Sequence, residues 1–95
     1  MIECMRFNTI NKGFCVGFAD IKIPEFNNME IYGITLYEKE GRRWVGFPSK
    51  QYEKDGETKY SPYFRFPEKE DYDNFCSETK KAIESKIADE SNVPF

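Results

Sequence analysis

The side chains that could carry out chemistry are few in this chain. Histidine is absent, which removes the commonest general base, the commonest zinc ligand and every Ser-His or Cys-His nucleophile pair. The cysteines Cys4, Cys15 and Cys76 are odd in number and have no CxxC spacing, so we expect buried or free thiols and no disulfide framework. The acids lie in loops and beside lysines on a helix face, and no two of them stand out for acid–base work. We therefore expect a protein that is not an enzyme and holds no cofactor or metal.

Cationic and aromatic residues occur together between residues 41 and 66, and they favour a binding role. This segment has six basic and three acidic residues, whereas 1–40 and 67–95 are both net acidic in a chain of formal net charge −3. Single-stranded nucleic acid needs cations for its phosphates and flat side chains for its bases, each stacked base contributing ~1–3 kcal/mol. The candidate nucleic-acid-binding residues are Arg42, Arg43, Trp44, Lys50, Tyr52, Lys54, Lys59, Tyr60, Tyr63 and Arg65.

The same residues allow two other interpretations. In the plainer one, the aromatic residues Trp44, Phe47, Phe64 and Phe66 are core and the cations form a solvated rim. In the other, the segment is a protein interface, because Tyr, Trp and Arg are enriched at such surfaces too. The alternative function is therefore a protein-interaction module that regulates or inhibits a host or cellular enzyme.

The last seven residues are the second candidate site. Asp89 and Glu90 precede Val93, Pro94 and Phe95, and no helical stripe continues beyond Ala88. Pro94 keeps this end extended, while Phe95 can fill an apolar pocket and its carboxylate can pair with a cation of a partner. We expect residues 89–95 to form a flexible, partner-binding acidic tail, and the alternative is a frayed end without a role.

These candidate sites must be positioned by one small domain, residues 1–88 of a chain of 95 that is 39% hydrophobic and 17% aromatic. A core of this size is modest, so we expect a homodimer or a higher oligomer. Runs separated by turn-forming residues predict strands over 2–10, 14–23, 29–38, 42–48 and 59–66, with a charged loop containing Asp55-Gly56 before the last one. Gly17, inside the second run, indicates a strongly curved strand.

Residues 68–88 form the predicted helix. Apolar side chains, together with Thr79, recur there at steps of three and four residues, and Pro67 opens the segment. The expected fold class is α+β, a curved antiparallel sheet of four to five strands with one C-terminal helix covering a sheet face. The chain has no long apolar run and no signal peptide at its start, so we expect a cytoplasmic protein without a membrane span.

The end of the chain also resembles a known family. Ala88-Asp89-Glu90-Ser91-Asn92-Val93-Pro94-Phe95 is similar to the acidic tip of bacterial and phage single-stranded DNA-binding proteins, which close with acids, a branched aliphatic residue and Pro-Phe. In that family the tip recruits replication, recombination and repair proteins and competes with DNA for the protein's own basic groove. The resemblance implies a protein of a bacterial or phage-infected cell that coats unpaired strands, with DNA favoured over RNA.

The body of the chain resembles other nucleic-acid binders. Residues 41–50, Gly-Arg-Arg-Trp-Val-Gly-Phe-Pro-Ser-Lys, followed by Asp55-Gly56, are similar to a stretch of the SpoVG family, whose members are small dimeric nucleic-acid binders. The order of strands and then a helix is similar to the transcriptional coactivator and Whirly class, whose curved sheets bind single-stranded DNA after oligomerising. The second likeness is a fold-level analogy, and a fold alone does not determine a function. Both resemblances imply nucleic acid as the partner.

Overall fold

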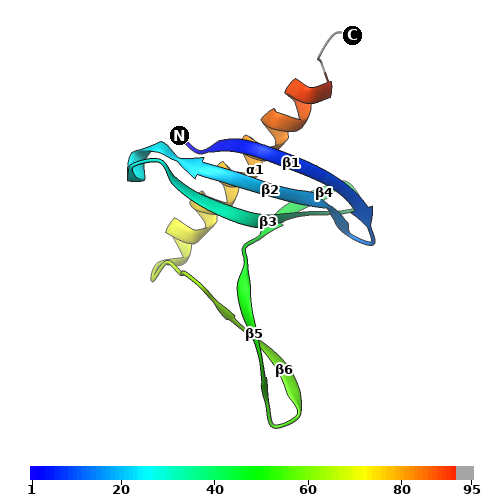
Figure 1. Cartoon of the computed structure of the whole chain (residues 1–95), viewed down its shortest axis with the longest axis vertical. Helices are drawn as coiled ribbons and strands as arrows, with labels where there is room; N and C mark the ends of the chain where they lie inside the picture. Colours follow the sequence, from blue (N-terminus) through cyan, green and yellow to red (C-terminus); the bar gives the residue numbers. More distant parts are fainter. Residues whose placement is uncertain (92–95) are drawn as a thin grey trace.

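The computed structural model describes residues 1–91, with side chains as far as Asp89 (Figure 1). Its first four strands, β1 (Glu3–Lys12), β2 (Cys15–Ile23), β3 (Met29–Lys39) and β4 (Arg42–Gly46), form one antiparallel sheet in the order β1-β2-β3-β4. A short 3₁₀ helix, η1 (Pro24–Phe26), connects β2 to β3. Strands β5 (Ser49–Lys54) and β6 (Glu57–Pro62) form a separate hairpin, and α1 (Lys69–Ser91) follows. The expected α+β fold, a curved antiparallel sheet followed by one helix, is confirmed.

Helix α1 passes behind the four-stranded sheet and covers one of its faces (Figure 1). The buried core lies between them, and Ile83 of α1 is fully buried in it. Thr79 is also fully buried, and its hydroxyl donates a hydrogen bond of 2.7 Å to the Phe75 carbonyl, so no polar atom is left unsatisfied there. The sheet supplies the rest of the core, namely Cys4, Ala19, Ile21, Ile23, Ile34, Leu36 and Val45.

The segment from 49 to 58 is not the charged loop that the sequence predicted. Residues 49–54 are strand β5, which pairs with β6 through a two-residue turn at Asp55-Gly56, with φ of 54° and 77°. Positive φ at both central residues defines the type I′ turn, whose twist matches that of the flanking strands. The strand expected over 59–66 ends at Pro62, and it joins this hairpin instead of the main sheet.

Gly17 lies where two strands approach closely. The β1–β2 and β2–β3 pairings each contain register shifts, and one of those in β2 lies between Cys15 and Gly17. A Cβ atom at residue 17 would lie 2.3 Å from the Asn8 carbonyl oxygen and 2.7 Å from a ring carbon of Phe7. Because the first neighbour is backbone, it cannot rotate away. A side chain at this position would therefore force β1 and β2 apart.

We predict that Gly17→Ala destabilises the fold by about 3 kcal/mol, the upper end of ordinary overpacking costs. Urea unfolding followed by circular dichroism measures the change. Gly41→Ala is the matched control, because a Cβ there meets no atom within 4 Å and the strain comes only from φ of 82°. Its cost should be ~1–2 kcal/mol. Equal losses in the two variants would contradict a steric role for Gly17.

Helix α1 continues further than the sequence predicted. Asp89, Glu90 and Ser91 belong to it, so the expected flexible tail cannot begin at residue 89. These residue types have ordinary helix propensities, so their chemistry does not require the helix to end at Ala88. Val93, Pro94 and Phe95 lie outside the described residues. Between residues 1 and 91 no helix combines the length and apolar composition needed to cross a membrane. No disulfide joins the three cysteines, all of which lie in this part of the chain.

Candidate nucleic-acid interface

The structure distributes the ten predicted binding residues over several surfaces. Arg42 and Trp44 lie on the sheet face opposite α1, hereafter the open face, whereas Arg43 lies on the helix-covered face. The hairpin carries Lys50, Tyr52, Lys54, Lys59 and Tyr60, and all of them are exposed. Tyr63 and Arg65 are exposed in the connection between β6 and α1. The residues therefore do not form one continuous site.

The Arg43 guanidinium forms ion pairs with two carboxylates. Its Nε donates a hydrogen bond of 2.8 Å to Glu38 of β3, and its Nη1 donates one of 3.3 Å to Glu84 of α1. The hydrogen bond to Glu38, with the charges of both carboxylates, raises the pKa of Arg43 above its ordinary value. A phosphate would have to displace these partners. Arg43 thus connects the helix to the sheet, and the structure does not bring it to the open face.

The open face carries an aromatic pair at the end of the sheet near the β3–β4 turn. Tyr37 lies directly opposite Trp44 in the register, and their rings stack with centroids 5.4 Å apart at an interplanar angle of 17°. Trp44 remains 43% exposed, so one face of the stack is accessible to a ligand. The Tyr37 ring also covers Gly46, where a Cβ would lie only 2.9 Å from it. A larger residue at position 46 would displace the pair.

Three cations lie at the same end of the sheet as this pair. Lys39 and Arg42 are paired residues on either side of the Glu40-Gly41 turn. Lys12, the last residue of β1, pairs with Cys15, which in turn pairs with Tyr37. Among the described residues, none of the three forms an ion pair with a carboxylate. Unpaired surface cations beside exposed rings are the combination that a phosphate backbone with unstacked bases requires.

Two phenylalanines extend the aromatic surface. Phe14 is 54% exposed, its ring centroid lies 5.1 Å from Lys39 Nζ, and its carbonyl accepts a hydrogen bond of 2.8 Å from the Glu38 N–H. Phe18 is 43% exposed on the open face opposite Thr35. We call the whole surface the open-face patch, and it consists of Lys12, Phe14, Phe18, Tyr37, Lys39, Arg42 and Trp44.

Five residues of the open-face patch were absent from the sequence-based prediction, namely Lys12, Phe14, Phe18, Tyr37 and Lys39. Two of them, Tyr37 and Lys39, could have been predicted from one local feature, the Glu40-Gly41 turn. The Glu40-Gly41 turn sets Lys39 opposite Arg42 and Tyr37 opposite Trp44, so the same alternation that exposes Trp44 exposes Tyr37. The contributions of β1 and β2 depend on pairing between distant strands, which no local pattern revealed.

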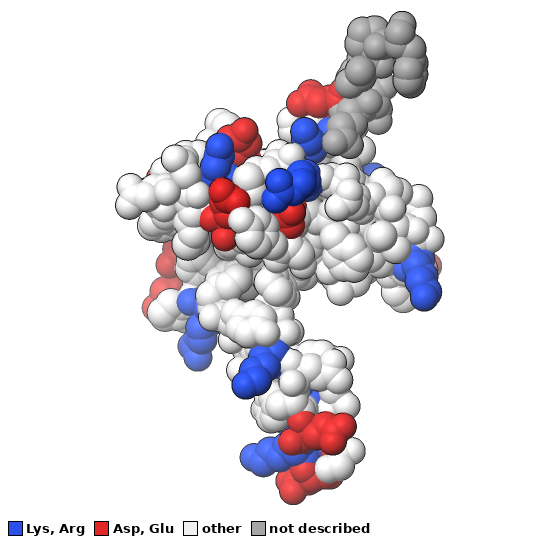
Figure 2. Space-filling view, viewed as in Figure 1, with Lys and Arg blue, Asp and Glu red and all other residues white. Residues whose placement is uncertain are grey.

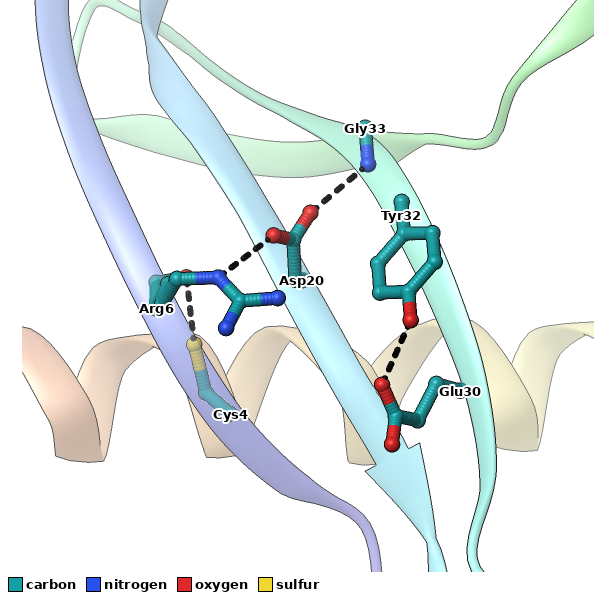
Figure 3. A network of polar contacts seen from close by, with 6 residues as sticks. All are labelled: Cys4, Arg6, Asp20, Glu30, Tyr32 and Gly33. Carbon is teal, nitrogen blue, oxygen red and sulfur yellow. Dashed lines mark hydrogen bonds and ion pairs between the residues drawn. The ribbon is translucent and has the colours of Figure 1, made fainter.

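At the other end of the open face, basic and acidic side chains pair with each other (Figure 3). Arg6 Nε donates a hydrogen bond of 2.9 Å to Asp20, and Asp20 accepts another of 3.0 Å from the Gly33 N–H. The hydrogen bond to Asp20, and then its charge, raise the pKa of Arg6. Tyr32 donates a hydrogen bond of 2.6 Å to Glu30 beside them. Uncompensated positive charge on this face is therefore concentrated at the open-face patch.

The hairpin β5–β6 has two unlike sides. Lys50, Tyr52, Lys54 and Lys59 share one side, with Tyr52 directly opposite Lys59, while Tyr60 lies on the other side opposite Gln51. The hairpin projects from the body as an arm, and its far end bears both basic and acidic side chains (Figures 1 and 2). One of the lysines, Lys59, forms an ion pair of 3.6 Å with Glu57. A nucleic-acid role for this lysine side stays a prediction.

Three of the four aromatic residues in the plainer interpretation pack on α1, and one of them, Phe47, also packs against the buried core. Phe47, Phe64 and Phe66 are half-buried against Phe75 of α1, with ring centroids 5.2, 6.1 and 5.2 Å from it respectively. Phe47 and Phe64 flank the arm and contact each other edge to face at 5.3 Å. This aromatic cluster fixes the base of the arm to the helix. Trp44, in contrast, is not core.

The fold and the open-face patch thus define a small α+β protein with one accessible sheet face that is both aromatic and cationic. Comparison with protein-family models, with curated proteins and with solved structures found no match to this chain. The resemblances to single-stranded DNA-binding proteins, to SpoVG and to the Whirly class therefore stay predictions. No group of three or more Cys, Asp or Glu residues within 1–91 is arranged to hold a metal ion.

Proposed function

We propose that this protein binds single-stranded nucleic acid on the open-face patch, with DNA favoured over RNA. The observation that supports this most directly is the stacked Tyr37–Trp44 pair beside Lys12, Lys39 and Arg42, three cations without carboxylate partners in the described chain. The preference for DNA rests on the resemblance of the chain's last residues to single-stranded DNA-binding proteins.

The mechanism requires no bond-making chemistry. Bases stack on the exposed rings of Phe18 and Trp44, and phosphates contact Lys39 and Arg42 at the turn. Several copies side by side, as the homo-oligomer expected from the small core, would coat an unpaired strand and protect it in the cytoplasm of a bacterial or phage-infected cell. The protein is chemically unchanged by this binding.

Titration with a short unstructured oligonucleotide, followed by Trp44 fluorescence, tests the proposal directly because Trp44 is the only tryptophan in the chain. We expect quenching at low salt. Three phosphate contacts predict a slope of about −2 in log K against log salt, so affinity should fall about twentyfold for a fourfold rise in salt. RNA of the same sequence should bind more weakly. No quenching at low salt would refute the proposal and favour the protein-interaction module.

The second part of the proposal is that the acidic C-terminal residues recruit replication or repair proteins. Its support is the sequence resemblance, together with exposed Asp89 in the last turns of α1. We predict that deleting Pro94 and Phe95 leaves the thermal midpoint unchanged, leaves DNA affinity equal or higher, and removes binding to purified replication or repair proteins. A lower thermal midpoint would instead show that Phe95 belongs to the folded core.

A further inference from the structure

Little of the β5–β6 arm packs against the rest of the described chain. All twelve residues of its two strands are exposed, and the arm contributes nothing to the buried core. An isolated two-stranded hairpin is at best marginally stable in water. The aromatic cluster fixes only its base, through Phe47 and Phe64. An arm of this kind is ordered more firmly when its exposed side packs on a partner.

The body of the same chain contains a cavity whose chemistry matches the arm. It is a shallow depression that is open to solvent, has a volume of about 440 Å³ and lies between the N-terminal residues, η1 and the first half of α1. Its apolar walls include Ile23, Phe26, Phe66 and Phe75, and its acidic residues are Glu25, Asp71 and Glu78.

Two of those three acids lack a cationic partner within the described chain. Glu25 pairs with the N-terminal amine, whose hydrogen bond lowers the pKa of its carboxyl. Asp71 and Glu78 form no ion pair among residues 1–91. The cavity is therefore apolar inside, with two uncompensated negative charges at its edge.

The lysine side of the arm has the complementary properties. One aromatic ring, Tyr52, lies among Lys50, Lys54 and Lys59, with Glu57 as the single acid on that side. The arm thus presents an excess of two positive charges around a ring, and the cavity presents two negative charges around an apolar hollow. Complementary charges of this kind specify a partner and its register.

We propose that the arm of one copy docks in the cavity of a second copy, with Tyr52 entering the cavity and the lysines facing Asp71 and Glu78. The exchange is reciprocal, because a two-fold axis makes each copy donor and acceptor at once. The reach is sufficient, since a six-residue strand spans about 20 Å. Phe66 and Phe75 line the cavity and also hold the base of the arm, so the cavity of each copy lies near the base of its own arm. If two arms pack side by side in antiparallel orientation, the tip of each arm points toward the cavity of the other copy. This inference goes beyond nucleic-acid binding and does not rest on it.

Nucleic acid is the competing occupant of the lysine side. The second copy is favoured because the chain itself supplies a cavity of matching polarity and charge. The open-face patch already offers cations for phosphates, and it lies on β1–β4, outside the arm. Carboxylates such as Asp71 and Glu78 would repel a phosphate backbone approaching the cavity, whereas they attract the arm's lysines.

A charge-swap experiment tests the exchange. In one variant the arm is reversed (K50E/K59E), and in the other the cavity is reversed (D71K/E78K). Each variant alone places like charges together, so its dimer dissociation constant, from sedimentation equilibrium, should rise roughly hundredfold over the wild-type value. A mixture of the two variants restores opposite charges at both contacts and should form heterodimers of wild-type affinity. Glu53→Lys, on the other side of the arm, is the control and should leave the constant unchanged.

Circular dichroism establishes that each variant is folded, and restored affinity in the mixture independently requires folded partners. A monomeric wild-type protein at all concentrations would overturn the proposal, as would dimers that persist in both variants. If the wild type is monomeric and K50E/K59E loses oligonucleotide binding, the lysine side belongs to nucleic acid. Monomeric variants should still show Trp44 quenching by a short oligonucleotide, so failure of the arm exchange and failure of the proposed function give different results.

Discussion

Reversing both turn cations of the open-face patch, in K39E/R42E, should weaken binding of single-stranded DNA by about hundredfold. Each substitution removes one charge-assisted phosphate contact, and such contacts contribute about 1.5 kcal/mol or more apiece. The slope of log K against log salt should also become shallower by about 1.4, because two fewer phosphates are neutralised. Fluorescence titration at several salt concentrations measures both quantities.

The matched control is K80E/K81E on α1, which changes the net charge equally and lies on the element that covers the opposite sheet face. DNA affinity should change no more than about threefold, since interactions over distances beyond the Debye length are screened. Equal losses in the two double variants would show that only overall charge matters. Unfolding curves should stay the same for K39E/R42E, because neither Lys39 nor Arg42 is buried.

Ile83→Ala should cause the largest loss of stability of any single truncation in α1. Its side chain is fully buried between the helix and the sheet, and removing such a side chain costs about 2–5 kcal/mol. A domain of this size has a total stability of only about 5–14 kcal/mol. The thermal midpoint should therefore fall by roughly 10 to 25 °C, measured by circular dichroism or calorimetry.

Ser85→Ala is the control for this prediction, because Ser85 lies two residues away on the exposed side of the same helix. It should change stability by no more than about 0.5 kcal/mol. Loss of the same size in both variants would contradict a packing role for Ile83, because alanine is the better helix former at both positions and helix propensity alone predicts no loss.

The helix could be predicted from sequence because its buried stripe is periodic. Thr79 and Ile83, four residues apart, are both fully buried in the structure, as their spacing indicated. Strand β5 could not be predicted in the same way. All its residues are exposed, so neither of its sides is apolar and the alternation that marks a half-buried strand is missing. The Asp55-Gly56 dipeptide is the one local signal for a hairpin there, and the sequence-based prediction placed it in a charged loop.

The candidate site also has one part that the local sequence could predict and another that it could not. Alternation along β4 is a local property, so sequence could place Arg42 and Arg43 on opposite faces of a strand. It could not tell which face α1 covers, and that choice places the half-buried Arg43 between Glu38 and Glu84 while leaving Arg42 beside Trp44. Local spacing therefore determined the helix stripe and the approximate positions of β1 to β4. Tertiary packing decided which aromatic and cationic residues meet on the open face, because Lys12 and Phe18 belong to β1 and β2, and their place beside the Tyr37–Trp44 pair depends on pairing between separate strands.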